Sequence, residues 1–348
     1  LTGELACCAG SSGPGHVHLI NGLYDAQRSG ARVLAIASTI FPGVGTEYFQ
    51  ETNTIKLFDD CSYYNQVATT PEQFPRMLQG AMQAAISSCG VGVIGLPGDL
   101  AAENATAGLS STFSFPTRQR VCPAEQEIRE LADLLNNAKK VTLYCGIGAK
   151  DAHPELVQLA KYEKVRENLR SAAAVRGKEE KIQPEYVISV VDELSSDDAI
   201  FTVDTGMTCV WGARYLQATG MRKMLGSFNH GSMANAMPQA IGAALAYPGR
   251  QVVALCGDGG ISMLLGDLAT IVQYHLPIKL IVFNNRSLGM VKLEMEVAGL
   301  PDWQTTMLNP DFARVALSMG MAGYNVINPD DVFPTLQKVF NADGPALG

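Results

Sequence analysis

Two polar side chains, Asp258 and Asn285, each follow an apolar run of strand length. The runs are residues 251–256 (QVVALC) and 278–283 (IKLIVF, with Lys279 inside it). Strands this apolar indicate a parallel sheet that is covered on both faces. A right-handed crossover between two such strands brings their carboxyl ends to one edge of the sheet, where ligands bind. We therefore expect Asp258 and Asn285 to lie close together at that edge.

The types of these residues indicate a metal site made of oxygen atoms. A carboxylate, a side-chain amide oxygen and a backbone carbonyl, for which Ser287 is the candidate, suit Mg²⁺ whose other ligands are water and phosphate oxygens. No Cys or His joins them, which argues against Zn²⁺. Gly259 and Gly260 allow close approach of an anion at the start of a helix predicted over 262–274, where the partial positive charge favours a diphosphate. The predicted ligand is a metal-bound diphosphate.

The same residues resemble the signature of thiamine diphosphate enzymes, a Gly-Asp-Gly followed at a fixed distance by Asn-Asn. The two elements are 257–259 and 284–285, and the stretch between them must hold one helix and the next strand. The resemblance implies thiamine diphosphate and Mg²⁺ as cofactors. The residues that it assigns to the metal and to the diphosphate turn are Asp258, Asn285, Ser287, Gly257, Gly259 and Gly260.

A second segment, residues 226–238, fits the same cofactor by resemblance. It implies that the carbonyl of Gly231, next to Ser232, accepts a hydrogen bond from the aminopyrimidine ring, and that Met233 wedges the cofactor into a bent shape. The bend brings the amino group beside the thiazolium carbon, so the cofactor deprotonates itself with a large proximity advantage.

A third segment, residues 204–207, follows a strand predicted over 199–203. In the family the matching loop contacts the diphosphate. The resemblance therefore implies that Gly206 and Met207 offer backbone amides to it.

Along its whole length the chain is similar to the flavin-linked pyruvate oxidases, in particular their quinone-dependent, acetate-forming members. The first part of the resemblance rests on four segments, which are 10–15, 18–25, 48–51 and 96–99. It implies that Phe49 and Gln50 face the thiazolium and the substrate and that His18 acts in acid–base chemistry. It also implies that the turn containing Gly146 and Gly148 touches a flavin.

The resemblance implies oxidative decarboxylation of pyruvate to acetate and CO₂, with FAD as a further cofactor and ubiquinone as the electron acceptor. It also implies a homo-oligomer, expected to be a tetramer, because the family's cofactor lies between two subunits. The family's essential glutamate is expected upstream of Leu1, and its membrane-associating tail downstream of Gly348. The expected location is the cytoplasm, with peripheral contact at the inner face of the cell membrane.

Two alternatives stay open. An acetolactate synthase-like carboligase would pass the same carbanion to a second keto acid. A non-catalytic remnant would keep only cofactor binding or oligomer formation. A nucleotide-binding dehydrogenase is disfavoured, because no Gly-x-Gly-x-x-Gly follows a first strand with an acidic residue after the next one.

Composition agrees with a buried α/β enzyme. The chain has 348 residues, of which 47% are hydrophobic and 17% charged. Its net charge of −8 argues against binding of nucleic acid, whose phosphates require basic patches. Eight Cys without framework spacing indicate a reducing compartment. We expect no signal peptide and no membrane-spanning segment.

The predicted fold class is α/β, with doubly wound parallel sheets in two cofactor-binding domains and a remnant of a flavin domain between them. The expected divisions are a pyrimidine-binding domain (1–101, its N-terminal part missing), a linker (102–123), a partial central flavin-binding domain (124–163) and a diphosphate-binding domain (164–348, its C-terminal tail missing).

The expected elements of the first domain are strands over 4–8, 32–37 and 92–96 and helices over 14–29 and 71–89.

The central remnant has one predicted strand, 141–145, between helices over 124–137 and 154–161. A single βα unit cannot bury both faces of a sheet, so it should not be stable alone. Near 162–165 the resemblance skips roughly a hundred residues, most of one domain. Either residues are absent from this sequence or the molecule carries a deletion, and we favour the first.

Overall fold

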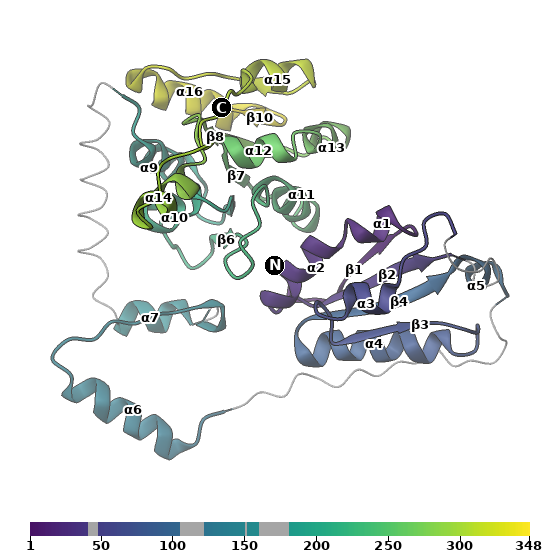
Figure 1. Cartoon of the computed structure of the whole chain (residues 1–348). Helices are drawn as coiled ribbons and strands as arrows, with labels where there is room; N and C mark the ends of the chain where they lie inside the picture. Colours follow the sequence, from purple (N-terminus) through teal and green to yellow (C-terminus); the bar gives the residue numbers. More distant parts are fainter. Residues whose placement is uncertain (41–47, 105–121, 150–151, 160–180) are drawn as a thin grey trace. The chain divides into compact units, whose positions relative to one another are not determined.

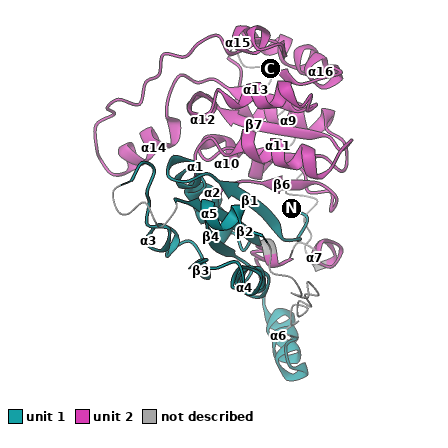
Figure 2. Cartoon of the chain, turned by 90° about the vertical axis from the view of Figure 1, so that its right-hand side faces the viewer, with its two compact units in different colours: residues 1–138, 228–230 teal, residues 139–227, 231–348 magenta. Residues whose placement is uncertain are grey.

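The computed structural model describes residues 1–40, 48–104, 122–149, 152–159 and 181–348. The chain divides into two compact units, coloured separately in Figure 2. Unit 1 comprises Leu1–Ala138 with Phe228–His230, and unit 2 comprises Lys139–Ser227 with Gly231–Gly348. Each unit contains one parallel sheet. The predicted boundaries at 101, 123 and 163 remain predictions.

The sheet of unit 1 has the strand order β1-β2-β4-β3. Its strands are β1 (Ala6–Gly10), β2 (Val33–Thr39), β3 (Tyr64–Val67) and β4 (Val91–Pro97). Its helices are α1 (Pro14–Val17), α2 (Ile20–Arg28), α3 (Thr54–Phe58), α4 (Phe74–Ser88), α5 (Gly98–Ala102) and α6 (Glu125–Asn137).

Helices pack on both faces of this sheet. Leu23 of α2 and Phe58 of α3 share a core with Ala35 and Val93. On the other face, α4 packs against the neighbouring strand residues through Ala81, Leu34 and Ile94. Consecutive strand residues, such as Leu34 and Ala35, therefore face opposite cores, as expected for a sheet with helices on both faces.

The sheet of unit 2 has six strands in the order β6-β5-β7-β8-β10-β9. They are β5 (Ile200–Val203), β6 (Lys223–Leu225), β7 (Val252–Gly257), β8 (Lys279–Phe283), β9 (Ala322–Gly323) and β10 (Ala346–Leu347). Its α-helices are α7 (His153–Leu159), α9 (Pro184–Leu194), α10 (Met207–Tyr215), α11 (Ala236–Ala246), α12 (Asp258–Met263), α13 (Asp267–Gln273), α14 (Gly289–Val297), α15 (Phe312–Ser318) and α16 (Val332–Asn341). Two 3₁₀ turns, η2 (Ile147–Ala149) and η3 (Pro329–Asp331), complete it.

The central strands of this sheet separate two cores. Val252, Ala254 and Cys256 of β7 pack with α11, α13 and α15, whereas Val253 and Leu255 pack with α9 and α16. Figure 1 shows these helices around β7 and β8. The doubly wound parallel α/β class is therefore confirmed.

Two predicted helices are each divided in the structure. The predicted helix over 262–274 is α12 and α13, with a break at 264–266, where Gly266 precedes the first residue of α13. The predicted helix over 14–29 is α1 and α2. The prediction of one continuous helix was wrong in both places, because apolar periodicity persists across a short break.

The predicted strand over 141–145 is also wrong. Residues 141–146 have no regular secondary structure and are exposed, Tyr144 completely. A strand needs a hydrogen-bonded neighbour, and within the described residues none pairs with this segment. An apolar run therefore does not form a strand here.

Helix α6 stands out by its exposure. Three large apolar side chains on it, Ile128, Leu131 and Leu134, are each more than half exposed.

None of the described helices is long and apolar enough to cross a lipid bilayer.

Candidate functional site at the sheet edge of unit 2

Polar residues follow the carboxyl ends of three adjacent strands. Asp204 follows β5, Asp258 follows β7, and Asn284-Asn285 follows β8. Strand β7 pairs with both neighbours, with Val203 opposite Leu255 and Gly257 opposite Phe283. The parallel register brings all three strand ends to the same edge, as the sequence indicated for Asp258 and Asn285.

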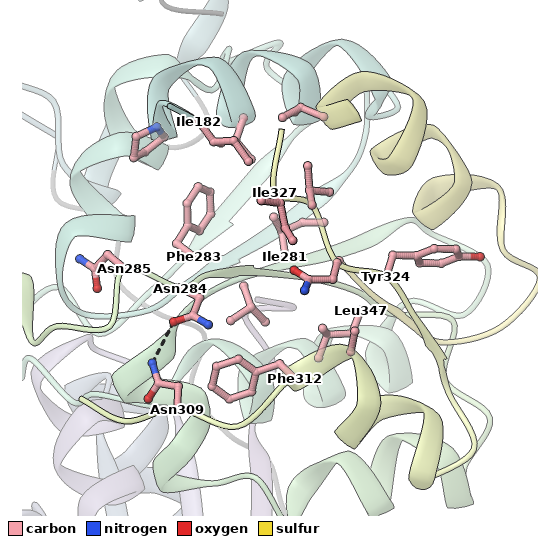
Figure 3. Close-up of a pocket in the computed structure, with 18 of the residues that line it drawn as sticks. Ile182, Ile281, Phe283, Asn284, Asn285, Asn309, Phe312, Tyr324, Ile327 and Leu347 are labelled. Atoms are coloured by element: carbon pink, nitrogen blue, oxygen red, sulfur yellow. Dashed lines mark hydrogen bonds between the residues drawn. The ribbon is translucent and has the colours of Figure 1, made fainter. Parts of the chain in front are cut away.

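Asp258 is almost fully buried, with 3% of its surface exposed. Its Oδ1 accepts the backbone N–H of Gly259 at 3.0 Å, and its Oδ2 accepts the side-chain N–H of Asn309 at 2.7 Å. The same Asn309 nitrogen donates to Oδ1 of Asn284 at 2.9 Å (Figure 3). Because a carboxylate only accepts, the nitrogen of Asn309 must face it. Asn309 therefore fixes the orientation of the Asp258 carboxylate.

Asn285 and Ser287 lie in a tightly held loop. Oδ1 of Asn285 accepts the backbone N–H of Ser287 at 3.0 Å, and Arg286 between them has a left-handed φ of 57°. Ser287 also forms an isolated antiparallel bridge with Thr306. Asn285 and Ser287 thus belong to one hydrogen-bonded loop that follows β8.

The donor set suits a hard cation. Among the described residues, no three His, Cys, Asp or Glu side chains gather to hold a metal. A metal at this edge would instead combine one carboxylate, the amide oxygen of Asn285 and backbone carbonyls, which is chemistry typical of Mg²⁺.

The glycine turn after β7 accommodates its neighbours only because it lacks side chains. A Cβ atom on Gly259 would lie 2.8 Å from Cδ2 of Leu288 and 3.4 Å from Cε of Met233. Met233 is thus brought from a distant segment to the turn that contains Asp258. The preceding Gly231 has a φ of 78°, a conformation that favours glycine, and Ser232 donates its backbone N–H to Oγ of Ser227 at 2.9 Å.

The loop after β5 reaches the same edge. Gly206 has a φ of 135° and precedes the first residue of α10, Met207. A Cβ atom placed on Gly289 would lie 3.1 Å from Nδ2 of Asn285 and 3.5 Å from Cγ of Met207. The structure therefore brings Met207, Gly289 and Asn285 together.

Asp204 is a buried carboxylate that the sequence did not single out as a site residue. Only 1% of its surface is exposed. Burial raises its pKa to about 6, although hydrogen bonds from backbone amides partly oppose this effect. Its strand-end position after an apolar run is the sequence signal that could have identified it.

The residues predicted in unit 1 lie in a loop and at the end of α1. Phe49 is 78% exposed, and Gln50 has a left-handed φ of 65° while its carbonyl accepts the hydroxyl of Ser12 at 3.0 Å. His18 lies on the surface directly after α1. The roles of Phe49, Gln50 and His18 remain predictions.

A different histidine, His16, is fully buried in unit 1. Its Nδ1 lies 2.9 Å from the carbonyl of Ser38 and its Nε2 lies 2.5 Å from Oγ1 of Thr52. Since a carbonyl only accepts, Nδ1 carries the proton and Nε2 accepts from the Thr52 hydroxyl. Burial lowers the pKa of His16. Sequence reasoning missed this residue, which lies in the first turn after the Gly-Pro-Gly loop.

The Gly146–Gly148 turn has open space around it. Both glycines are exposed, and a Cβ atom on either would meet nothing within 4 Å. Their flavin contact remains a prediction.

A cavity of about 630 Å³ opens at the carboxyl end of β8 (Figure 3). Asn284, Asn285 and Asn309 form its polar part. Its apolar part includes Ile182, Trp211, Phe283, Phe312, Tyr324 and Ile327.

Comparisons with known proteins identify the family. Residues 1–57 match the N-terminal TPP binding domain of thiamine pyrophosphate enzymes, and residues 204–347 match the C-terminal TPP binding domain. Thiamine pyrophosphate is another name for thiamine diphosphate. The two matches together cover more than half of the chain.

Three curated relatives align along almost the whole chain. YdaP of Bacillus subtilis (strain 168), whose name describes a thiamine pyrophosphate-containing protein, is 28% identical over 460 residues, covering 100% of this chain and 80% of its own. Pyruvate oxidase of Lactiplantibacillus plantarum is 27% identical, covering 94% and 74%. The acetolactate synthase isozyme 2 large subunit of Escherichia coli (strain K12) is 24% identical, covering 99% and 84%.

The YdaP alignment is longer than the 348 residues of this chain, so YdaP has residues with no counterpart here. With both terminal cofactor-binding domains present and the middle domain lacking, the chain belongs to the thiamine pyrophosphate-dependent enzyme family.

Proposed function

We propose that the chain binds thiamine diphosphate through Mg²⁺ held by Asp258, Asn285 and the backbone carbonyl of Ser287. One observation carries this proposal: Asp258 directly follows strand β7, and Asn284-Asn285 directly follow the neighbouring parallel strand β8. A buried carboxylate is costly unless donors or a cation offset the burial, and Asp258 has two N–H donors and no cationic partner among the described ion pairs. A divalent ion fits this environment.

The proposed cofactor contacts extend over three segments of unit 2. The contact of Met233 with the Gly259 turn supports its role as the wedge under the bent cofactor. The carbonyl of Gly231 is proposed to accept a hydrogen bond from the aminopyrimidine ring, and the φ of 78° at this position favours glycine. The residues proposed to contact the cofactor are Gly206, Met207, Gly231, Ser232, Met233, Gly257, Gly259 and Gly260.

For the reaction, we propose oxidative decarboxylation of pyruvate. Pyruvate and water give acetate, CO₂, two protons and two electrons; FAD, when bound, would accept the electrons, and ubiquinone would be their final acceptor. Thiamine diphosphate, when bound, supplies the electron sink for the carbanion left by decarboxylation. The similarity to the pyruvate oxidase of L. plantarum supports this reaction.

The residues of this chain would orient the substrate and handle protons. Phe49 and Gln50 are proposed to face pyruvate, and the exposed His18 is proposed to transfer a proton. Gly146 and Gly148 are proposed to contact the flavin.

The test mixes the purified full-length protein with Mg²⁺, thiamine diphosphate, pyruvate and a dye acceptor, with and without FAD. We expect dye reduction that requires both cofactors and that is lost in D258A. The control is N328A, because the side chain of Asn328 lies away from the proposed site and donates to Asp331 near the start of α16. If the wild-type protein binds the cofactor but does not reduce the dye, the oxidative reaction is rejected and the proposed metal site is retained. If the wild-type protein neither binds the cofactor nor reduces the dye, the whole proposal is rejected.

The second candidate is an acetolactate synthase-like carboligase. It is supported by the similarity to the E. coli acetolactate synthase subunit, which covers 99% of this chain. Product analysis separates the two reactions. Acetate indicates oxidation, and a five-carbon acetohydroxy acid indicates carboligation.

The third candidate is a non-catalytic, cofactor-binding remnant. Residues 141–145, predicted as a strand before the turn expected to contact the flavin, have no regular secondary structure, and this supports it. The alignment with YdaP also supports it, because YdaP has residues with no counterpart in this chain. Thiamine diphosphate binding with neither acetate nor acetohydroxy acid formed would favour it.

We further propose a cytoplasmic homo-oligomer, a tetramer, with peripheral contact at the inner face of the membrane. Light scattering measures the mass of the assembly. Sedimentation with anionic lipid vesicles tests the membrane contact, and a fully active monomer that stays in the supernatant would contradict both.

A further inference from the structure

The carboxylate of Asp204 lies where three chain segments meet beneath the proposed cofactor site. Asp204 begins the loop 204–207, and its Oδ1 lies 3.5 Å from the backbone nitrogen of Ala236 and from Nδ2 of Asn235. Backbone amides of Ala234 and Gly257 also donate to it. One side chain thus contacts the loop after β5, the segment after Met233 and the turn that precedes Asp258.

The backbone at Ala234 is held in an unfavourable conformation. Its φ of 64° is left-handed, which is uncommon for a residue with a side chain. Ala234 directly follows Met233, whose Cε reaches the Gly259 turn. Amides in such a bend point inward and form a concave anion-binding surface, and here the chain's own carboxylate fills it.

The fit around Asp204 leaves no room for a side chain opposite it. A Cβ atom on Gly260 would lie 1.7 Å from Oδ2 of Asp204 and 3.2 Å from the backbone nitrogen of Ala234. Among the described ion pairs, none includes Asp204. Its partners are therefore backbone N–H groups and one amide side chain rather than a cation.

We propose that Asp204 is a positioning residue that fixes Met233 and the 257–260 turn for cofactor binding by accepting the backbone amides of 234–236 and Gly257. The inference rests on the proposed thiamine diphosphate site. Asp204 itself touches neither cofactor nor substrate in this role. It acts by holding an otherwise unfavourable backbone bend in the cofactor-free protein.

The experiment compares the full chain with D204N, which keeps the shape of the side chain but replaces one acceptor oxygen with an NH₂ group, and with D204A. The matched control is D192N. Asp192 is another buried carboxylate of unit 2, outside the proposed site, which pairs with Arg222 at 2.6 Å and accepts the backbone N–H of Gln217. Hydrogen exchange of single amides is measured without cofactor, and calorimetry measures binding of thiamine diphosphate with Mg²⁺.

In D204N we expect at least tenfold faster exchange at Ala236 and Gly257 and at least tenfold weaker cofactor binding. D204A should show larger effects in the same direction. D192N should lose global stability but keep both local readouts. If D204A does not fold, D204N alone decides the question.

Two outcomes separate the inference from the proposed function. A wild-type chain that binds no thiamine diphosphate rejects the proposed function, and unchanged exchange in D204N then rejects the inference as well. A wild-type chain that binds the cofactor, with D204N equal to it in exchange and affinity, overturns the inference alone. Equal weakening of cofactor binding in D204N and D192N also overturns it, because the effect then follows general stability.

Discussion

The side-chain nitrogen of Asn309 lies 2.7 Å from Oδ2 of Asp258, and this contact joins a residue of the loop before α15 to the carboxylate at the end of β7. If Asp258 binds Mg²⁺, Asn309 sets the direction in which its free lone pairs point. Replacing Asn309 with Ala should weaken Mg²⁺-dependent binding of thiamine diphosphate roughly ten- to hundredfold, since a hydrogen bond to a charged group contributes about 1.5–3 kcal/mol. Calorimetry measures the change, N328A is the control, and an unchanged affinity contradicts the role of Asn309.

Gly260 should not tolerate a side chain. A methyl group there would overlap Oδ2 of Asp204, so G260A is expected to lower the free energy of unfolding by about 3 kcal/mol. In the same turn region, Gly266 has helical φ and ψ and open space around it, so G266A should be neutral or stabilise by up to about 1 kcal/mol. Urea unfolding of both variants makes the comparison, and equal stability of the two would contradict the close fit around Gly260.

The burial of Asp204 predicts a pH dependence of stability. Its pKa is about 6 in the folded chain against an ordinary value of 3.8, so the folded chain holds the proton more tightly than the unfolded chain. The resulting stabilisation is complete below about pH 3.8 and is lost as the pH rises to about 6, by about 3 kcal/mol at most. The difference in unfolding free energy between wild type and D204N should therefore fall over this range. A constant difference between pH 4 and 7 would refute the shift.

Lys279 lies inside the apolar strand β8, and its Nζ donates to the carbonyl of Gly344 at 2.8 Å and to that of Ala342. The side chain is 5% exposed. K279A would leave both carbonyls without this donor and create a cavity, so a loss of about 2–4 kcal/mol in unfolding free energy is expected. K338A on the exposed side of α16 is the control and should change stability by less than about 1 kcal/mol. Similar losses in both variants would contradict the structural role of Lys279.

His16 and His18 should separate folding from catalysis. H16A removes a buried ring that contacts Ser38, Thr52 and the ring of Phe58, and it should destabilise unit 1 by about 2–4 kcal/mol. H18A removes an exposed side chain and should change stability by less than about 0.5 kcal/mol while lowering turnover of pyruvate. Thermal unfolding and steady-state kinetics measure the two effects. Full turnover in H18A would remove His18 from the proposed mechanism.

The sequence predicted the part of the site that depends on strand order. Apolar runs before Asp258 and Asn285 are enough to place both residues at one sheet edge, because parallel strands share a direction. Asn309 could not be predicted in this way. It contacts Asp258 from 51 residues further along the chain, and no local pattern encodes that loop contact.

The errors in secondary structure have the same origin. The apolar run at 141–145 carries strand propensity, but a strand forms only beside another strand, which is tertiary information. His16 was missed for a related reason, because the sequence near the start of this helix does not give the direction of each side chain. Burial distinguishes His16 from His18, and burial depends on the packed fold.

Strand β7 is paired along both edges and packed on both faces, so it is among the parts of unit 2 that open last during unfolding. Asp258 extends directly from this strand, whereas Asn285 belongs to a loop. On warming, the Asp258 carboxylate should stay ordered until unit 2 unfolds as a whole, whereas the loop that carries the Asn285 amide should become mobile at a lower temperature. A metal bound between them would then be released through movement of the loop that contains Asn285, before β7 itself unfolds.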